Sequence, residues 1–368
     1  HHGLGRSRGD VLFIAQALAG NGMAVVAVDA AKHGARAWCT KNTQTGVSTG
    51  CATGSTCDTT PFAQQPGDPA TARPGLCTGG NLALLPIGCD PTTQPTCWNG
   101  AQGNSATSGA FVISGNLFRS RDTVRQDILD QSMVVRVMTS QAGQAALASV
   151  AGAPFLLDPT KVYYVGQSLG AIEGTLDVAA NPRISKAVLN VGGATILDIL
   201  TTSPSPGVGG AFLAALASLG ITPGTEQFLL FTIAAKWILD PADPANFAQN
   251  LVAAPLPNLL VDPTGQTPQA AKAVLGQAAR CDGTVPNPTN QLLYGLVGLH
   301  PIAPLTADPA PSLQWFMSSS SAGACPVGAA SHGFLLDWSV PAMATAGQAN
   351  VVAYLLGGPV SPSPVVVP

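Results

Sequence analysis

One serine in a strand–turn–helix pattern constrains the fold of this chain more than any other feature. Residues 166–170 are Gly-Gln-Ser-Leu-Gly, preceded by the β-type run Lys-Val-Tyr-Tyr-Val and followed by a helix-compatible run over 171–176. A serine on such a tight turn has a strained backbone and an exposed hydroxyl, and the flanking glycines let strand and helix pack closely. We interpret Ser168 as a nucleophile. The alternative is an incidental serine in a glycine-rich turn, since the chain has 41 glycines.

Apolar runs and helical patterns alternate through the rest of the chain. Short buried strands are predicted over 23–28, 162–165, 187–191, 273–276 and 313–317, and helices over 10–19, 121–139, 291–297 and 343–356. Such alternation is typical of an α/β fold, in which a mostly parallel sheet is covered by helices on both faces. The strand over 313–317 is expected to be the last one.

Two long segments interrupt this pattern. Residues 35–108 are rich in Thr, Gly, Pro and Cys without apolar periodicity, which indicates a disulfide-pinned insertion. Residues 194–258 are apolar and helical in pattern, and they indicate a cap over the mouth of the sheet or, alternatively, an ordinary packed helical insertion. The expected core segments are 1–34, with an oxyanion loop, a helix and a strand, 109–193 with the serine turn, and 259–368.

Cysteine usage predicts disulfides. Six of the eight cysteines lie between positions 39 and 97, and none of these six forms the C-x2-C pair that zinc sites favour. We therefore expect no metal, and an oxidising location: secreted, periplasmic or on the cell surface. The pairing among these six stays open; they are Cys39, Cys51, Cys57, Cys77, Cys89 and Cys97.

The charge pattern excludes some partners. The formal net charge is −3 and there is no basic block, so nucleic acid is not an expected partner. Only 10% of the residues are charged, which suits work on apolar or insoluble material but equally fits a high-GC genome. No apolar run of about 18 residues predicts a membrane span. The chain begins abruptly at His1, without a visible signal peptide, so a trimmed or mature fragment with a missing N-terminal segment is expected.

A serine nucleophile needs a base, and the base needs a carboxylate. After such a turn the chain order is Ser, then Asp or Glu, then His, which leaves His300 and His332 as candidate bases. His332 lies in a Gly-flanked loop after the strand at 313–317, whereas His300 follows a helix and is expected to be a helix-end or surface residue. We therefore favour His332 as the base.

Asp282 is the leading candidate for the acid. It follows the end of the strand at 273–276, where catalytic groups gather in parallel sheets. Asp262 is the alternative, but no convincing strand precedes it. Cys281 is adjacent to Asp282 and Cys325 precedes His332 by seven positions, so a Cys281–Cys325 disulfide would tie the acid loop to the base loop.

An oxyanion hole needs two backbone N–H groups. Leu169, the residue after the nucleophile, is one candidate donor, and Leu4 in the glycine-rich loop at 2–5 is the other. In the alternative interpretation the first two histidines are a tag remnant. Gly3 and Gln167 are expected to lie beside the substrate.

These motifs resemble the α/β-hydrolase superfamily. The resemblance spans most of the chain: the loop at 2–5, the strand at 23–28 with His-Gly after it, the serine turn, the run Asp-Gly-Thr-Val-Pro at 282–286, and His332. The chain is similar to bacterial secreted lipases and esterases with large insertions. The first strands of that fold are missing here, and Gln167 stands where histidine is frequent.

The resemblance implies an eight-stranded, mostly parallel sheet and a triad of Ser168, His332 and Asp282. It also implies a secreted carboxylic ester hydrolase that cleaves small-molecule or polymeric esters of apolar acids, without a cofactor. The alternatives are a polyester depolymerase or peptidase with the same triad, and a non-catalytic binding protein on a hydrolase scaffold.

Overall fold

The computed structural model describes most of the chain. The described residues are 1–36, 38–49, 56–60, 72–78, 109, 112–113, 116–151, 157–301, 312–318, 332–338 and 340–367. Cys51, Cys89, Cys97 and Cys325 lie outside them, as does most of the predicted cysteine-rich insertion.

A parallel sheet forms the centre of the molecule. Its strands are ordered β10-β9-β7-β6-β5, with β8 paired to β9, and every pairing is parallel. The strands are β5 (Val162–Gln167), β6 (Ile184–Asn190), β7 (Ala273–Ala279), β8 (His300–Pro301), β9 (Ser312–Ser318) and β10 (Val365–Val367). Strands β6 and β7 are almost wholly buried, as expected for parallel strands covered on both faces.

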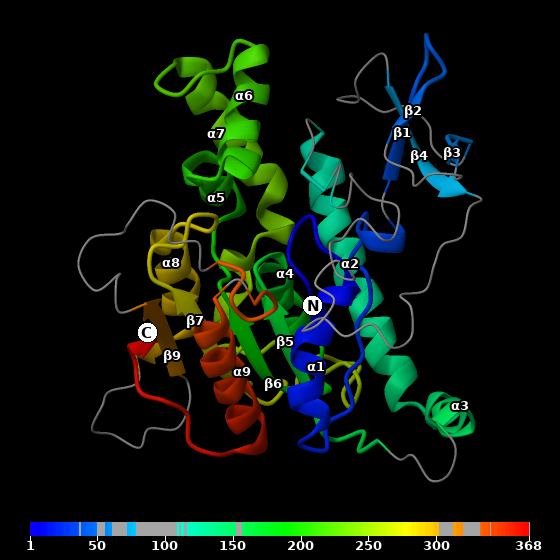
Figure 1. Ribbon diagram of the computed structural model, residues 1–368, viewed down its shortest axis with the longest axis vertical. Helices are drawn as coiled ribbons and strands as arrows, with labels where there is room; N and C mark the ends of the chain where they lie inside the picture. The colour runs from blue at the N-terminus through cyan, green and yellow to red at the C-terminus, as the bar shows by residue number, and fades with distance from the viewer. Residues whose placement is uncertain are drawn as a thin grey trace.

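Helices cover both faces of this sheet. On one face, α1 (Leu12–Ala19) and α9 (Pro341–Leu356) pack against it and against each other (Figure 1). On the other face lie α4 (Leu169–Ala180) and α8 (Asn287–Val297), and α2 (Leu117–Thr139) packs on α4 and leads into α3 (Gln141–Ala151). The predicted mostly parallel α/β architecture is confirmed. The described sheet has six strands, whereas the resemblance implied eight.

The segment between β6 and β7 is helical. It contains α5 (Ile196–Thr202), a π-helical turn (Pro206–Gly210), α6 (Ala211–Ser218) and α7 (Glu226–Leu239), followed by three short 3-10 turns. Thr195 and Thr225 cap α5 and α7, because their hydroxyls accept hydrogen bonds from the N–H groups of the first turn. In Figure 1 these three helices stand together at one end of the sheet.

Two strand predictions were wrong. Residues 23–28 form no strand; Met23, Val25 and Ala27 pack on the core while Ala24 and Val26 are exposed. An uninterrupted apolar run predicted burial on both sides, but only alternate side chains find a core to contact. The strand at 313–317 is also not the last one, because β10 in the C-terminal tail pairs with β9.

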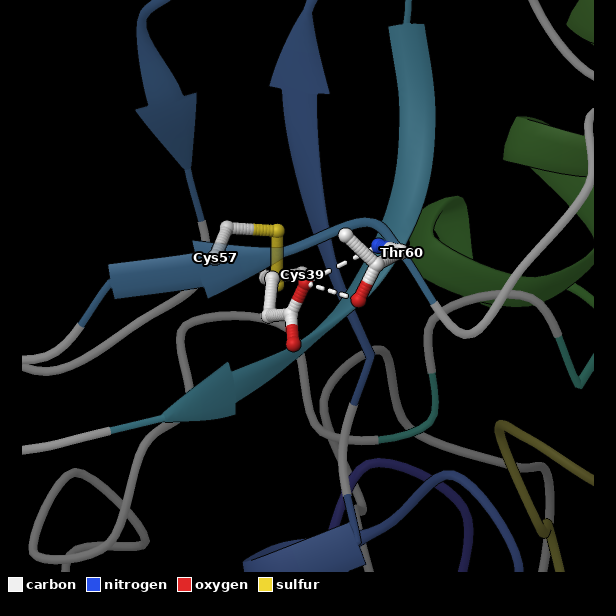
Figure 2. The surroundings of a disulfide bond; sticks show 4 residues. Cys39, Cys57 and Thr60 are labelled. Carbon is white, nitrogen blue, oxygen red and sulfur yellow. Dashed lines mark hydrogen bonds between the residues drawn. A yellow bond between two sulfur atoms is a disulfide. The ribbon is translucent and has the colours of Figure 1, made fainter.

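Part of the cysteine-rich insertion forms a small antiparallel sheet that the sequence did not predict. Its order is β2-β1-β4-β3, from β1 (Trp38–Asn42), β2 (Ser48–Thr49), β3 (Thr56–Asp58) and β4 (Ala72–Thr78). A disulfide joins Cys39 to Cys57, and Thr60 closes the turn after β3 by donating two hydrogen bonds to the Asp58 carboxylate (Figure 2). The disulfide assigns one pair among the six cysteines whose pairing the sequence left open.

None of the helices among the described residues is long and apolar enough to cross a bilayer.

Candidate active site

Ser168 lies on the turn between β5 and α4. Its backbone has φ 57° and ψ −119°, which is strained for a residue with a side chain. The neighbouring glycines are required, because a Cβ on Gly166 would lie 2.2 Å from the Gly170 carbonyl oxygen, and one on Gly170 would lie 2.5 Å from the His1 carbonyl oxygen. The Ser168 N–H donates to the Asn190 carbonyl on β6 at 2.8 Å, which fixes the turn on the sheet.

Three side chains that are distant in sequence form one line of hydrogen bonds. His332 Nε2 lies 2.7 Å from Ser168 Oγ, and His332 Nδ1 lies 2.7 Å from Asp282 Oδ2. The other oxygen of Asp282 accepts from the N–H groups of Thr284 and Val285, at 2.8 and 2.9 Å. The Asp282 side chain is fully buried, whereas that of His332 is 16% exposed. The aspartate is therefore held rigidly and the imidazole faces the serine.

The acid loop is pinned by a residue that the sequence analysis did not single out. Asn287, at the start of α8, accepts a hydrogen bond from the Cys281 N–H at 3.0 Å and donates to the Ala279 carbonyl at 2.7 Å. These contacts join the end of β7, which precedes Asp282, to the start of α8, which follows it. Cys281 is itself disulfide-bonded. Because Cys325 lies outside the described residues, the Cys281–Cys325 pairing stays a prediction.

The two other candidates lie away from this line of hydrogen bonds. His300 is exposed and belongs to β8. Asp262 caps a surface turn, where its carboxylate accepts hydrogen bonds from Thr264 and Thr267.

The loop at 2–5 lies against the serine. A Cβ on Gly3 would lie 3.3 Å from the Ser168 Cβ, so a side chain there would crowd the serine. Leu4 and Leu169 both line the cavity beside Ser168. Among the described residues, no group accepts a hydrogen bond from either of their N–H groups. Their role as the two oxyanion donors stays a prediction.

A cavity of about 710 Å³ opens beside Ser168 and His332. Much of its wall is apolar, and Arg6, Ser205, Thr284 and Asp337 add polar groups. The apolar wall comes from α2, α4, the helical segment after β6 and the acid loop: Val124, Ile172, Ile196, Ile199, Leu200, Val208 and Val285. Gly3 and Gln167 also line the cavity, but the Gln167 Oε1 accepts a hydrogen bond from the Leu336 N–H at 2.8 Å.

A second polar cluster is buried between α2 and α4. His1 Nε2 lies 2.6 Å from Asp127 Oδ2 and 3.5 Å from Glu173 Oε2. Burial alone would lower the pKa of His1, but the hydrogen bond and charge of Asp127 raise it above its usual value. Burial and the neighbouring Asp127 raise the pKa of Glu173 well above the usual range, and burial raises the pKa of Asp177 to about 7.

This cluster has donor atoms of the kind that bind metals. The donor atoms of His1, Asp127 and Glu173 lie within 4.8 Å of one another. However, His1 pairs with Asp127 directly, and an Arg36 guanidinium nitrogen lies 3.9 Å from the other Asp127 oxygen. The negative charge of Asp127 is therefore compensated by groups of the chain itself.

Comparisons with known proteins give little further guidance. No protein-family model and no curated protein matches the sequence. Among solved structures, acetyl xylan esterase 1 from Thermoanaerobacterium sp. JW/SL YS485 is similar over 53% of this chain and 53% of that chain, with 14% sequence identity and a TM-score of 0.26. The chain thus matches about half the length of that esterase. The geometry of the site carries the functional inference instead.

Proposed function

We propose that this protein is a serine carboxylic ester hydrolase, an esterase or lipase that acts through an acyl-enzyme. One observation carries the proposal: a buried carboxylate, an imidazole and a serine hydroxyl on a strained turn are joined by two hydrogen bonds of 2.7 Å, beside an apolar cavity. Such a line of groups can activate a hydroxyl that is otherwise a poor nucleophile near neutral pH.

The reaction would proceed in two halves. Ser168 Oγ attacks the ester carbonyl carbon while His332 Nε2 takes the hydroxyl proton, and Asp282 stabilises the imidazolium that forms. The N–H groups of Leu4 and Leu169 donate to the oxygen that becomes negative. When the tetrahedral intermediate collapses, the C–O bond to the alcohol breaks and His332 returns the proton to the leaving oxygen. A water molecule, deprotonated by His332, then attacks the acyl carbon; the bond from this carbon to Ser168 Oγ breaks, His332 returns the proton to Oγ, and the acid leaves.

The cavity supports esters of apolar acids as substrates. Ile172 lies one helical turn after Ser168, and Ile199 and Val208 from the helical segment face the same space. This segment would act as the predicted cap, covering an acyl chain bound to the serine. The Cys39–Cys57 disulfide supports an oxidising, extracytoplasmic location.

Replacing the nucleophile tests this proposal. Ser168→Ala should lower hydrolysis of short p-nitrophenyl esters by about 10³-fold or more, because the attacking oxygen is lost. Its melting temperature should stay close to that of the parent, since only one hydroxyl is removed. A variant that is folded and turns over ester at the parental rate would refute the proposal.

An exposed apolar stripe favours a second candidate, the hydrolysis of polymeric or aggregated esters. Leu229, Leu230, Ile233 and Trp237 on α7 are between 58% and 79% exposed. Large exposed apolar patches mark interaction surfaces. Comparing soluble esters, triglyceride emulsions, polyester films and peptide amides, with the parent and Trp237→Ser, would separate esterase, lipase, polyesterase and peptidase activity. Only hydrolysis of the insoluble esters should depend on Trp237.

The non-catalytic alternative has its own test. A binding protein on a hydrolase scaffold would not react with a fluorophosphonate probe, whereas an activated Ser168 would be labelled covalently and Ser168→Ala would not.

A further inference from the structure

A row of buried amide side chains crosses the sheet at the level of the nucleophile. Gln167 on β5 is in register with Asn190 on β6, Asn190 with Gln277 on β7, and Gln277 with Gln314 on β9. All four side chains are buried, and three of them belong to residues with no exposed surface. Burying an amide is costly unless its polar atoms are hydrogen-bonded, so the bonds that each one makes are informative.

Three of these amides form a chain that leads away from the site. Asn190 donates to Gln277 at 3.0 Å, and Gln277 donates to Gln314 at 3.2 Å. Gln314 donates in turn to Asn350 on α9 at 3.1 Å and to the Ser361 carbonyl at 2.7 Å. These bonds fix the register of β6, β7 and β9 and their position against α9. None of these bonds reaches the described part of the His332 loop, residues 332–338.

Gln167 is different, because its side-chain amide oxygen accepts a hydrogen bond from the loop that carries His332. Its Oε1 accepts from the Leu336 N–H at 2.8 Å. The same N–H also lies 3.1 Å from the Gly333 carbonyl, so it closes a turn that begins one residue after His332. Gln167 immediately precedes Ser168 in the chain. A single side chain therefore connects the strand of the serine to the turn beside the imidazole.

The same turn is held from its other side by α9. Gln348 Nε2 donates to the Leu335 carbonyl at 2.9 Å and to the Phe13 carbonyl of α1 at 3.1 Å. The apolar side chains of the turn are also buried, with the Phe334 ring 4.7 Å from that of Phe316 on β9. The turn after His332 is thus fixed by one acceptor, one donor and a packed core.

We infer that Gln167 is a positioning residue that sets the distance between His332 and Ser168, with Gln348 as the second tether of the histidine turn. The inference rests on the proposed function, because it assigns these amides a role in placing the proposed base. Gln167 does not touch the reacting atoms through its side chain. It acts by holding Leu336, and an error of about 1 Å in such a site costs about 100-fold in rate.

The test compares methionine substitutions at two positions of the amide row. Gln167→Met removes the acceptor but keeps the length of the side chain, and should lower kcat for p-nitrophenyl esters about 10- to 100-fold, with KM changed less than about twofold. Gln314→Met, the matched control, should lower the melting temperature and change kcat much less than Gln167→Met does, since Gln314 bonds to Asn350 and Ser361 and not to the described residues of the histidine turn. Gln167→Glu keeps an acceptor oxygen and should recover most of the lost kcat.

The outcomes separate this inference from the proposed function. If Ser168→Ala hydrolyses esters like the parent, the proposed function itself fails. If Ser168→Ala is inactive while Gln167→Met keeps the parental kcat, only the positioning role fails. Should Gln167→Met not fold, Gln348→Met decides: a fall in kcat of about 10-fold supports the tethered turn, and an unchanged kcat overturns it.

Discussion

Two histidine–carboxylate pairs lie against the same serine turn, and they differ in what the second ring nitrogen faces. His332 contacts Asp282 through Nδ1 and Ser168 through Nε2, each at 2.7 Å. His1 contacts Asp127 through Nε2 at 2.6 Å, but its Nδ1 faces the carbonyl oxygen of His2 at 3.0 Å. A carbonyl oxygen can only accept a hydrogen bond, so both nitrogens of His1 must donate. A hydroxyl can donate to a neutral ring.

Under the proposed function, this difference leaves only His332 suited to act as a base. The two acceptors around His1 favour its protonated form, the same direction in which Asp127 raises its pKa. In that form His1 has no lone pair with which to take a proton. His332 keeps a nitrogen for the serine proton and is partly open to the cavity, whereas the His1 side chain is 1% exposed. The same two residue types would therefore support the proposed chemistry in one place and packing in the other.

The largest expected difference between the pairs is in catalysis. Asp282→Asn should lower kcat for soluble esters about 10³- to 10⁴-fold, because the amide cannot stabilise the imidazolium and favours the wrong tautomer of His332. Asp127→Asn, the matched substitution in the other pair, should change kcat less than about threefold when measured well below the melting temperature. Steady-state kinetics on both variants makes the comparison. Equal losses of kcat would mean that the second pair takes part in the reaction.

The second expected difference is in stability, where the substitution of Asp127 should cost more than that of Asp282. Asp127→Asn should lower the free energy of unfolding by about 3 kcal/mol, because the His1 imidazolium loses its buried partner. Asp282→Asn should cost less, since the amide oxygen can still accept from Thr284 and Val285. Urea unfolding of the two variants measures both values. A larger loss of unfolding free energy in Asp282→Asn would show that the proposed site contributes more to stability than the polar cluster between α2 and α4.

The sequence predicted those parts of the molecule that follow from chain order and apolar patterning. The order Ser, Asp, His selected three side chains that the structure brings into contact, although their catalytic role stays a prediction. The strands β5, β6, β7 and β9 were each expected at their approximate positions, because parallel strands buried on both faces are continuous apolar runs.

What the sequence missed depends on register and on contacts between distant residues. Gln277 and Gln314 look like isolated polar interruptions of apolar strands, and only the pairing of the strands shows that they form one row with Asn190. Gln167 lines the cavity, so its predicted place beside the substrate stays a prediction, but nothing in the sequence indicated that its side-chain oxygen accepts a hydrogen bond from Leu336. The prediction of a strand at 23–28 was wrong for the same reason, because hydropathy does not show how many sides of a segment pack against the core.

The last expected effect is on the pH dependence of stability, and it sharpens the description of the buried cluster. Burial raises the pKa of Asp177 from 3.8 to about 7 in the folded state. Between about pH 4 and 7 the folded protein therefore retains a proton that the unfolded chain releases. Its stability falls as the pH rises through this window, by at most about 1.4 kcal/mol per pH unit.

Asp177→Asn imitates the protonated acid and should flatten the dependence of stability on pH between pH 4 and 7. The stability of the variant relative to the parent should therefore rise as the pH approaches 8. Asp262→Asn is the control: hydrogen bonds from Thr264 and Thr267 lower the pKa of this exposed group to about 2, so its substitution should leave the slope between pH 4 and 7 unchanged. Chemical unfolding at several pH values measures both. A parental slope in Asp177→Asn would assign the retained proton to Glu173, whose pKa is raised in the same direction by burial and by Asp127.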